Sequence, residues 1–436
     1  MVSVSTLRDL SVLCVSAVFY SLKPSTAETQ RTPRFAEKQV NAVDFSLPKS
    51  HELDRAEHEL VLRCIRPVQT AEDHARIRSL ISFGVDWDFL FLFARRHAVL
   101  PLLYSGLNKT AGDLIPHTEL QRFQKYFQDN LARNALFTAE LSRLLKLLGQ
   151  KGIDAIPYKG PVLSLFAYGD VALRRFVDLD IMVQKDDVEK AIELLLNDGY
   201  ELSKALAENQ RQVLLRTQHN VQFRRHKGQL IVELHWEVSP HLYASSVRAE
   251  DLWRNLVAAE LNSVAIKVLG PEDLIFSLLI HGSRHLWECL LWICDIGWIV
   301  ERHELNWQLL LERARTTRNE RIFLLGLYLS AQLLNVSLPI SIAKEIENDP
   351  QLEKLASLVA KRIFKGTVNQ PATPLEIFEF HVKVRKSWSA KARYFRHMFH
   401  PTDSDVSGIA LPRALSFGYY LMRPVRLLLK TGEDTH

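Results

Sequence analysis

The sequence predicts an α+β fold, with a small mixed β-sheet core flanked by helical N- and C-terminal regions. Two observations support this. Gly and Pro occur only 17 times each among 436 residues, below the average shares of about 7% and 5%, and a scarcity of turn formers favours long helices. Short apolar segments of strand character fall within one stretch, 151–240, whereas hydrophobic residues recur at helical spacing on both sides of it.

The length predicts two or three domains, at about 100–200 residues each. We expect a flexible N-terminal extension at 1–52, because residues 23–50 are polar, mixed and aperiodic. A helical domain at 53–150, a mixed α and β core at 151–240 and a helical region at 241–436 follow.

The composition is that of an ordinary globular protein, which we expect in the cytoplasm. Four cysteines form no Cys-x-x-Cys pair, which favours a reducing compartment. No run of about 18 apolar residues is free of charge, so we expect no transmembrane helix. The apolar run at 10–22 makes a poor signal peptide, because Asp9 accompanies Arg8. A net charge of +5 is too small to indicate nucleic-acid binding by itself.

From residue 53 to residue 150 the apolar spacing is helical. Hydrophobic residues recur at intervals of three and four through 60–65 and 77–83. A strongly amphipathic helix begins near Trp87 with Asp88 in its first turn, where the helix dipole favours acids. The same spacing predicts one long helix over 118–150.

The core region contains five short strand candidates separated by turn signals. Gly160-Pro161 suits the start of a helix after the first strand, and Lys227-Gly228 suits the turn between the last two strands, which we expect to be antiparallel. The candidates lie at 153–158, 179–183, 200–202, 219–225 and 230–238.

After Gly270-Pro271 the chain is helical again, and we expect no strand beyond residue 240. His281 and His285 are spaced to share one helix face, but Gly282 stands where a zinc protease carries its Glu, so we do not expect an independent metal site there.

Two aspartates predict a metal site at the start of the 179–183 strand. Asp178 and Asp180 lie two residues apart, so both side chains point to one face of the sheet. Carboxylates about 4 Å apart repel by roughly 4 kcal/mol at an effective dielectric constant near 20, so the pair needs a cation or a raised pKa. Glu233, in a later strand candidate, supplies a third hard oxygen ligand of the kind that suits Mg²⁺. Upstream, Gly160 lies at a strand-to-helix turn where backbone amides can meet a phosphate.

At these residues the chain resembles the polymerase-beta-like nucleotidyltransferases, and more closely the large bacterial family of uncharacterised nucleotidyltransferases. Members of that family show a Leu-Lys-Gly turn, a Tyr-Gly-Asp, an Arg four residues before an Asp-x-Asp, and later an Asp-Leu-His-Trp. The resemblance covers about 55–430, including Arg423-Pro424. The matching segments here are Tyr158-Lys159-Gly160, Tyr168-Gly169-Asp170, Arg174 with Asp178 and Asp180, and Glu233-Leu234-His235-Trp236.

The resemblance implies an enzyme that transfers a nucleoside monophosphate from an NTP to a hydroxyl of a small-molecule, peptide or protein acceptor and releases pyrophosphate. It implies Mg²⁺, or Mn²⁺, as cofactor. Asp178 and Asp180 would hold both metal ions, and Glu233 would hold the catalytic ion and accept the hydroxyl proton. Glu233 stands where an Asp is commoner in the family.

The resemblance also implies a set of residues that bind the nucleotide. Lys159 and Arg174 would face the triphosphate, and Gly160 would allow close approach of the backbone. The usual Gly-Gly/Ser turn of the superfamily reads Lys159-Gly160 here, so the charge of Lys159 replaces the contact of a serine hydroxyl. His235 would orient Glu233.

Two alternatives stay open. The metal-dependent enzyme is the preferred interpretation, and the alternative is a non-catalytic binding or partner protein that retains the fold, in which the acids would be splayed or paired with Arg174 and Arg175. Residues 381–400 carry six Lys and Arg residues, no acid and several aromatic residues, which keeps nucleic acid open as an acceptor without favouring it.

Overall fold

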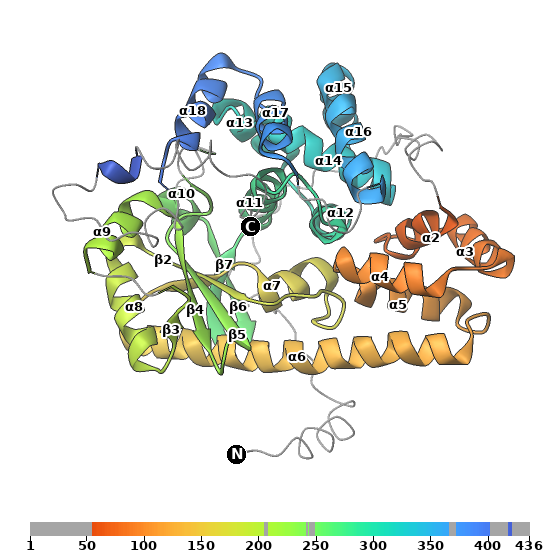
Figure 1. The fold of residues 1–436 in the computed structure, drawn as a ribbon, viewed down its shortest axis with the longest axis horizontal. Coiled ribbons are helices and arrows are strands. Elements are labelled where there is room, and N and C mark those ends of the chain that lie inside the picture. The colour runs from red at the N-terminus through yellow and green to blue at the C-terminus, as the bar shows by residue number, and fades with distance from the viewer. Residues whose placement is uncertain are drawn as a thin grey trace, which may run out of the picture.

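The computed structural model describes residues 55–204, 208–240, 243, 249–365, 372–401 and 417–420 (Figure 1). The predicted extension at 1–52 and the Arg423-Pro424 segment lie outside the described residues. Helices surround one mixed sheet, so the predicted α+β class is confirmed. Within these ranges, none of the helices combines the length and the apolar character that a membrane crossing requires.

The N-terminal part is helical, as predicted. One helix, α6, is 34 residues long, or roughly 51 Å at 1.5 Å per residue, and runs beneath both the N-terminal helices and the sheet in Figure 1. Its Phe123 belongs to the larger hydrophobic core and its Leu141 to a second core beneath the sheet, so one helix ties the two cores together. The helices are α2 (Ala56–Cys64), α3 (Ala71–Phe83), α4 (Trp87–Arg96), α5 (Leu100–Ala111) and α6 (His117–Gln150).

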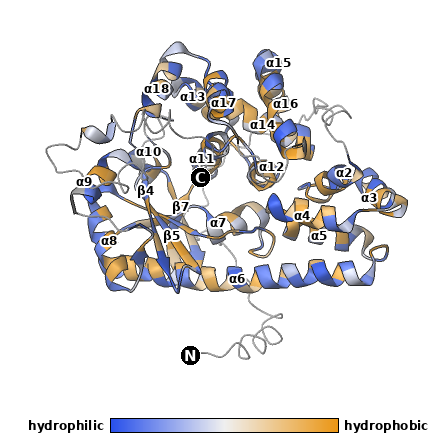
Figure 2. Cartoon of the chain, in the orientation of Figure 1, coloured by the Kyte–Doolittle hydropathy of each residue, from blue (hydrophilic) through white to orange (hydrophobic). Residues whose placement is uncertain are grey.

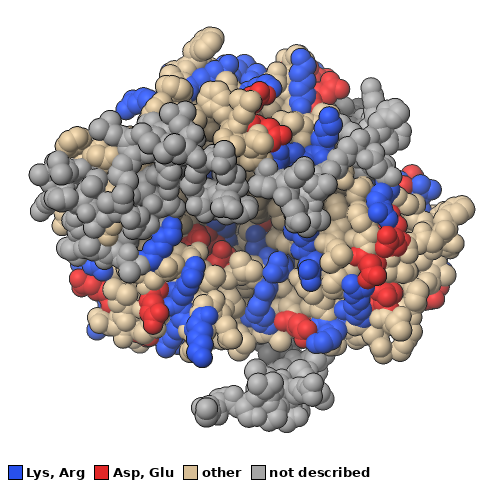
Figure 3. Space-filling view, in the orientation of Figure 1, with Lys and Arg blue, Asp and Glu red and all other residues tan. Residues whose placement is uncertain are grey.

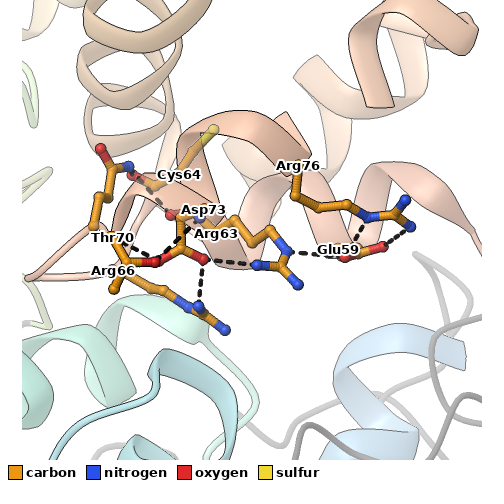
Figure 4. Close-up of polar contacts among 8 residues, drawn as sticks. Glu59, Arg63, Cys64, Arg66, Thr70, Asp73 and Arg76 are labelled. Atoms are coloured by element: carbon orange, nitrogen blue, oxygen red, sulfur yellow. Dashed lines mark hydrogen bonds and ion pairs between the residues drawn. The ribbon is translucent and has the colours of Figure 1, made fainter. Parts of the chain in front are cut away.

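A buried carboxylate fixes the first two helices to each other (Figure 4). Asp73 is 1% exposed and forms a capping box with Thr70 at the start of α3. Its Oδ1 accepts hydrogen bonds from Arg63 on α2 and from Arg66. Glu59 of α2 accepts hydrogen bonds from Arg63 and from Arg76 of α3. Helix α2 is therefore joined to α3 by charge as well as by apolar packing.

The main sheet has five strands in the order β1-β2-β5-β4-β3. β2 is parallel to β5, and every other pair is antiparallel. Each of the five strand candidates of the core region forms a strand, and β2 has the predicted bounds. The strands are β1 (Ala155–Pro157), β2 (Leu179–Val183), β3 (Glu201–Leu202), β4 (Asn220–Arg225) and β5 (Leu230–His235). The helical turns α7 (Gly160–Leu163) and η1 (Ser164–Tyr168) follow β1. η2 (Lys185–Asp187) and α8 (Val188–Asn197) follow β2, and α9 (Glu208–Thr217) precedes β4.

A β-hairpin lies where the sequence analysis expected only helices. β6 (Leu256–Leu261) and β7 (Val264–Leu269) are antiparallel, and the expectation of no strand beyond residue 240 was wrong. The two turn residues, Asn262 and Ser263, have φ of 50° and 60°, as a tight hairpin turn of the primed type requires. Along β7 buried and exposed residues alternate, and its apolar face joins the core beneath the sheet.

The remaining described residues form mainly helices, which lie above the sheet (Figures 1 and 2), and their apolar side chains belong to the larger hydrophobic core. Trp287 is fully buried among them, and a Cβ at Gly282 or Gly326 would collide with its ring. Gly282 is therefore required by packing. The helices are α10 (Ala249–Arg254), α11 (Pro271–Arg284), α12 (Leu290–Arg302), α13 (Trp307–Thr316), α14 (Glu320–Leu334), α15 (Ile340–Glu347), α16 (Pro350–Lys365), α17 (Pro374–Lys383) and α18 (Trp388–Met398).

Candidate functional site

The acidic residues meet where β2 lies beside β5. The two strands are parallel with Asp180 opposite Glu233 in the register, so these side chains stand next to each other. His235, two residues beyond Glu233, shares the face of Glu233, because side chains alternate along a strand. Asp178 lies in the bend directly before β2, close enough for the charges of Asp180 and Glu233 to act on its pKa. Asp180, Glu233 and His235 each offer a ligand atom, and these atoms all lie within 4.8 Å of one another.

Hydrogen bonds connect the cluster internally. The ammonium of Lys159 donates to Asp180 Oδ1 over 2.8 Å, and His235 Nε2 lies 3.1 Å from the same oxygen. His235 Nε2 also lies 3.3 Å from Glu233 Oε2, so it donates its proton between two carboxylates. On the far side of the ring, Nδ1 is 3.2 Å from the hydroxyl of Tyr158. The imidazole is thus oriented from both edges.

Two amides on β4 hold Glu233, and neither is among the site residues predicted from the sequence. Asn220 Nδ2 donates to Glu233 Oε2 over 3.0 Å, and Gln222 Nε2 donates to Oε1 over 3.3 Å. The signal was present, since these two polar residues alternate with the apolar Val221 and Phe223. Without the register that places Gln222 opposite Glu233, however, their target was not evident.

The three carboxyl groups differ in pKa. Burial, followed by the charges of Asp180 and Glu233, raises the pKa of Asp178 to about 7. Burial acts in the same direction on Asp180, but the ammonium of Lys159 and the hydrogen bond from His235 outweigh it and lower the pKa of Asp180. Burial also acts to raise the pKa of Glu233, but the hydrogen bond from His235 and the charges of His235 and Lys159 together outweigh it and lower that pKa. Lys159 and His235 therefore stabilise the charges of Asp180 and Glu233, whereas Asp178 forms no ion pair with any described residue, and the charges of Lys159 and Arg174 offset its burial only in part.

The turn before α7 lies beside the acids. Gly160 has φ of +56°, and a Cβ there would come within 3.3 Å of the carbonyl oxygen of Asp178, so a side chain would strain the backbone and crowd the start of β2. The preceding residue, Lys159, reaches Asp180 from this turn. Both residues predicted to bind phosphate from the turn therefore adjoin the acidic cluster.

Arg174 has a partner that the sequence did not indicate. Its Nε and Nη2 donate to the two carboxylate oxygens of Asp295 on α12, over 2.8 and 2.9 Å. The hydroxyl of Tyr168 donates to the same carboxylate over 2.7 Å, and all three side chains are buried. The pairing fixes the segment before β2 to the C-terminal helices. The ion pair with Asp295 engages Nε and Nη2 of Arg174, and Nη1 is the one guanidinium nitrogen not bonded to Asp295. The structure shows no contact of Arg174 with a phosphate, so that contact stays a prediction.

A family model described as "Uncharacterised nucleotidyltransferase" matches residues 84–335, a span that contains every residue of the cluster. No curated protein and no solved structure matches the chain.

We predict that the two aspartates have opposite effects on the stability of the metal-free protein. The folded-state pKa of Asp178 lies above the ordinary value of 3.8, so its contribution to stability is present below about pH 4 and is lost as the pH rises to about 7. Asp178→Asn should therefore raise the melting temperature at pH 8, with a smaller gain at pH 5. Asp180→Asn should lower it, because removing one partner of a buried ion pair costs about 3–5 kcal/mol.

Thermal unfolding in EDTA at the two pH values measures this. Asp154→Asn, at a side chain that is 62% exposed, is the control and should change little. If Asp178→Asn and Asp180→Asn lower the melting temperature equally at pH 8, then Asp178 is not the unbalanced carboxylate.

We also predict that Asp295→Asn destabilises the fold by about 3–5 kcal/mol, since it leaves the buried guanidinium of Arg174 without a carboxylate. Urea unfolding measures the change. Glu345→Gln breaks a surface ion pair with Arg315 and should cost about 1 kcal/mol or less. If the two variants unfold at the same urea concentration, the Arg174 pair does not anchor the segment before β2.

Proposed function

This chain belongs to the family of uncharacterised nucleotidyltransferases, and from that premise we propose that it is a metal-dependent enzyme transferring a nucleoside monophosphate from an NTP to an acceptor hydroxyl. The observation that carries the proposal is the register of β2 with β5, which sets Asp180 beside Glu233. Two carboxylates from one strand and a third from its neighbour form the donor set that phosphoryl-type transfer with divalent cations uses.

The residues present fit a divalent cation. Ligand atoms of Asp180, Glu233 and His235 lie within 4.8 Å of one another. The pKa of Asp178 is raised to about 7, because burial and the neighbouring carboxylates outweigh the charges of Lys159 and Arg174. We assign Asp178, Asp180 and Glu233 to Mg²⁺, which prefers carboxylate oxygens together with substrate phosphates. When bound, the ion supplies a Lewis acid for the α-phosphate and lowers the pKa of the attacking hydroxyl.

The protein's own groups would then move the proton and hold the phosphates. The acceptor oxygen forms a bond to the α-phosphorus, the bond to the α–β bridging oxygen breaks, and pyrophosphate leaves with the electron pair. Glu233, oriented by His235, accepts the hydroxyl proton. Lys159 stays protonated, because Asp180 outweighs burial and raises its pKa, and its ammonium faces the triphosphate.

We propose a small-molecule, peptide or protein hydroxyl as acceptor, in preference to nucleic acid. Within the basic 381–400 segment, His381 and Arg385 are buried, and Arg385 donates to the carbonyl oxygen of Tyr243, so these residues are not part of a surface for polynucleotide. On the described part of the face in Figure 3, basic and acidic side chains are interleaved. Such a pattern differs from the continuous basic stripe that a phosphate backbone favours.

One observation favours the second candidate, a non-catalytic binding protein. Lys159 and His235 already satisfy Asp180, and Asn220 and His235 satisfy Glu233, so two of the three carboxylates have partners without metal. A protein that only binds could keep this ion-paired arrangement. The two candidates differ in the requirement for Asp178, because metal-dependent transfer uses its carboxylate as a ligand and binding alone does not.

Labelled-NTP transfer tests the proposal. Purified protein is incubated with each labelled NTP, cell extract and Mg²⁺ or Mn²⁺, and we expect a labelled product that EDTA abolishes. Asp178→Asn and Asp180→Asn should each lower the rate by at least about 10²-fold, whereas Asp154→Asn should retain it. If the wild type gives neither labelled product nor divalent-dependent NTP binding, the non-catalytic candidate is supported.

A further inference from the structure

The last residue of α11, Arg284, is bound by imidazoles instead of a carboxylate. Its Nη1 lies 2.7 Å from His219 Nε2, and its Nη2 and Nε lie 3.1 and 3.3 Å from His285 Nε2. No acid of the described ranges lies within ion-pair distance of this guanidinium, unlike Arg174 and Arg313, which each pair with an aspartate.

Neither imidazole neutralises that charge. A guanidinium can only donate hydrogen bonds, so the Nε2 atom of His219 and that of His285 both accept and both rings are neutral. Burial, with the charge of Arg284 second, also lowers the pKa of His219, and its Nδ1 is buried without a hydrogen-bond partner in the described structure. A partly buried cation without a counter-ion is costly, which makes this position attractive to an anion.

Arg284 lies one imidazole away from the acidic cluster. His219 precedes β4, and its ring centroid is 6.0 Å from that of His235, which is hydrogen-bonded to Asp180. Asp180 and Glu233 are close enough for their charges to act on the pKa of Arg284, although burial outweighs them and lowers it. The C-terminal end of α11 thus carries a cation next to the carboxylates that we assign to the metal.

Two donors of Arg284 are available for a ligand. Of the five N–H groups of a guanidinium, one each from Nε, Nη1 and Nη2 is used by the imidazoles. One N–H on each terminal nitrogen has no partner among the described residues. Two donors on one guanidinium match a bidentate contact with phosphate oxygens.

We propose that Arg284, held by His219 and His285, binds the β- and γ-phosphates of the NTP and the pyrophosphate that leaves. The inference rests on the proposed nucleotidyl transfer and adds the residue that carries the leaving group. Negative charge accumulates on pyrophosphate as the α–β bond breaks, and a preorganised guanidinium stabilises it without reorganisation. Arg284 is then a second source of positive charge, from the C-terminal helices, beside Lys159 from the turn before α7.

Binding of inorganic pyrophosphate and tripolyphosphate tests the site directly. Isothermal titration with Mg²⁺ would compare wild type, Arg284→Gln, Arg284→Lys and the control Arg315→Gln, which removes one surface charge. We expect Arg284→Gln to weaken both ligands on the order of 10- to 100-fold, as the loss of charge-assisted hydrogen bonds implies. Arg284→Lys should recover part of the affinity, and Arg315→Gln should match wild type.

Thermal unfolding without ligand shows whether Arg284 serves ligand binding or the stability of the fold. A ligand-binding Arg284 predicts that Arg284→Gln melts no lower than wild type, since it removes an unneutralised cation. Wild-type affinity for both anions combined with a lowered melting temperature would overturn the proposal and make Arg284 a structural residue. A wild type that binds neither pyrophosphate nor tripolyphosphate would overturn it too.

The labelled-transfer assay distinguishes this inference from the proposed function. If wild type binds pyrophosphate through Arg284 but transfers no label, the anion site stands and the proposed function fails. If wild type transfers label and Arg284→Gln binds NTP and pyrophosphate equally well, the function stands and the role of Arg284 fails.

Discussion

The side-by-side placement of Asp180 and Glu233 on two parallel strands is the constraint on which the site depends. Two carboxylates in a buried setting repel each other, so the fold must surround them with donors. Lys159 comes from the turn after β1 and His235 from β5 itself. Asn220 is the nearer of two amide donors from β4. These contacts come from separate elements of the sheet region, and all of them are directed to the same two acids.

Lys159 and His235 stabilise the charges of Asp180 and Glu233, but the charge of Asp178 is not fully compensated. Burial beside Asp180 and Glu233 raises the pKa of Asp178 to about 7, so in the metal-free protein this group lowers stability once it ionises. Residues that lower the stability of a fold, and for which the fold itself gives no reason, are expected at functional sites. A divalent cation would supply the missing charge, which is why the requirement for Asp178 distinguishes the catalytic candidate from the binding one.

The C-terminal helices complete the site from above. Asp295 on α12 holds Arg174, and with it the segment that leads into β2. α11 ends in Arg284 beside His219, and its Gly282 lets Trp287 pack closely enough to fix that end of the helix. Because α6 carries residues of both hydrophobic cores, the sheet and the helices that face it both pack against this one helix.

The sequence by itself determined the α+β class and the bounds of β2, because strand periodicity and apolar spacing are local properties. It did not reveal the hairpin of β6 and β7, whose Asn-Ser turn is a weaker signal than Asn-Gly. Only the tertiary structure decided which charges meet: Arg174 and Asp295 are 121 residues apart, and Arg284 reaches His219 across 65. Such pairings depend on how helices pack against the sheet, and no spacing along the chain encodes that.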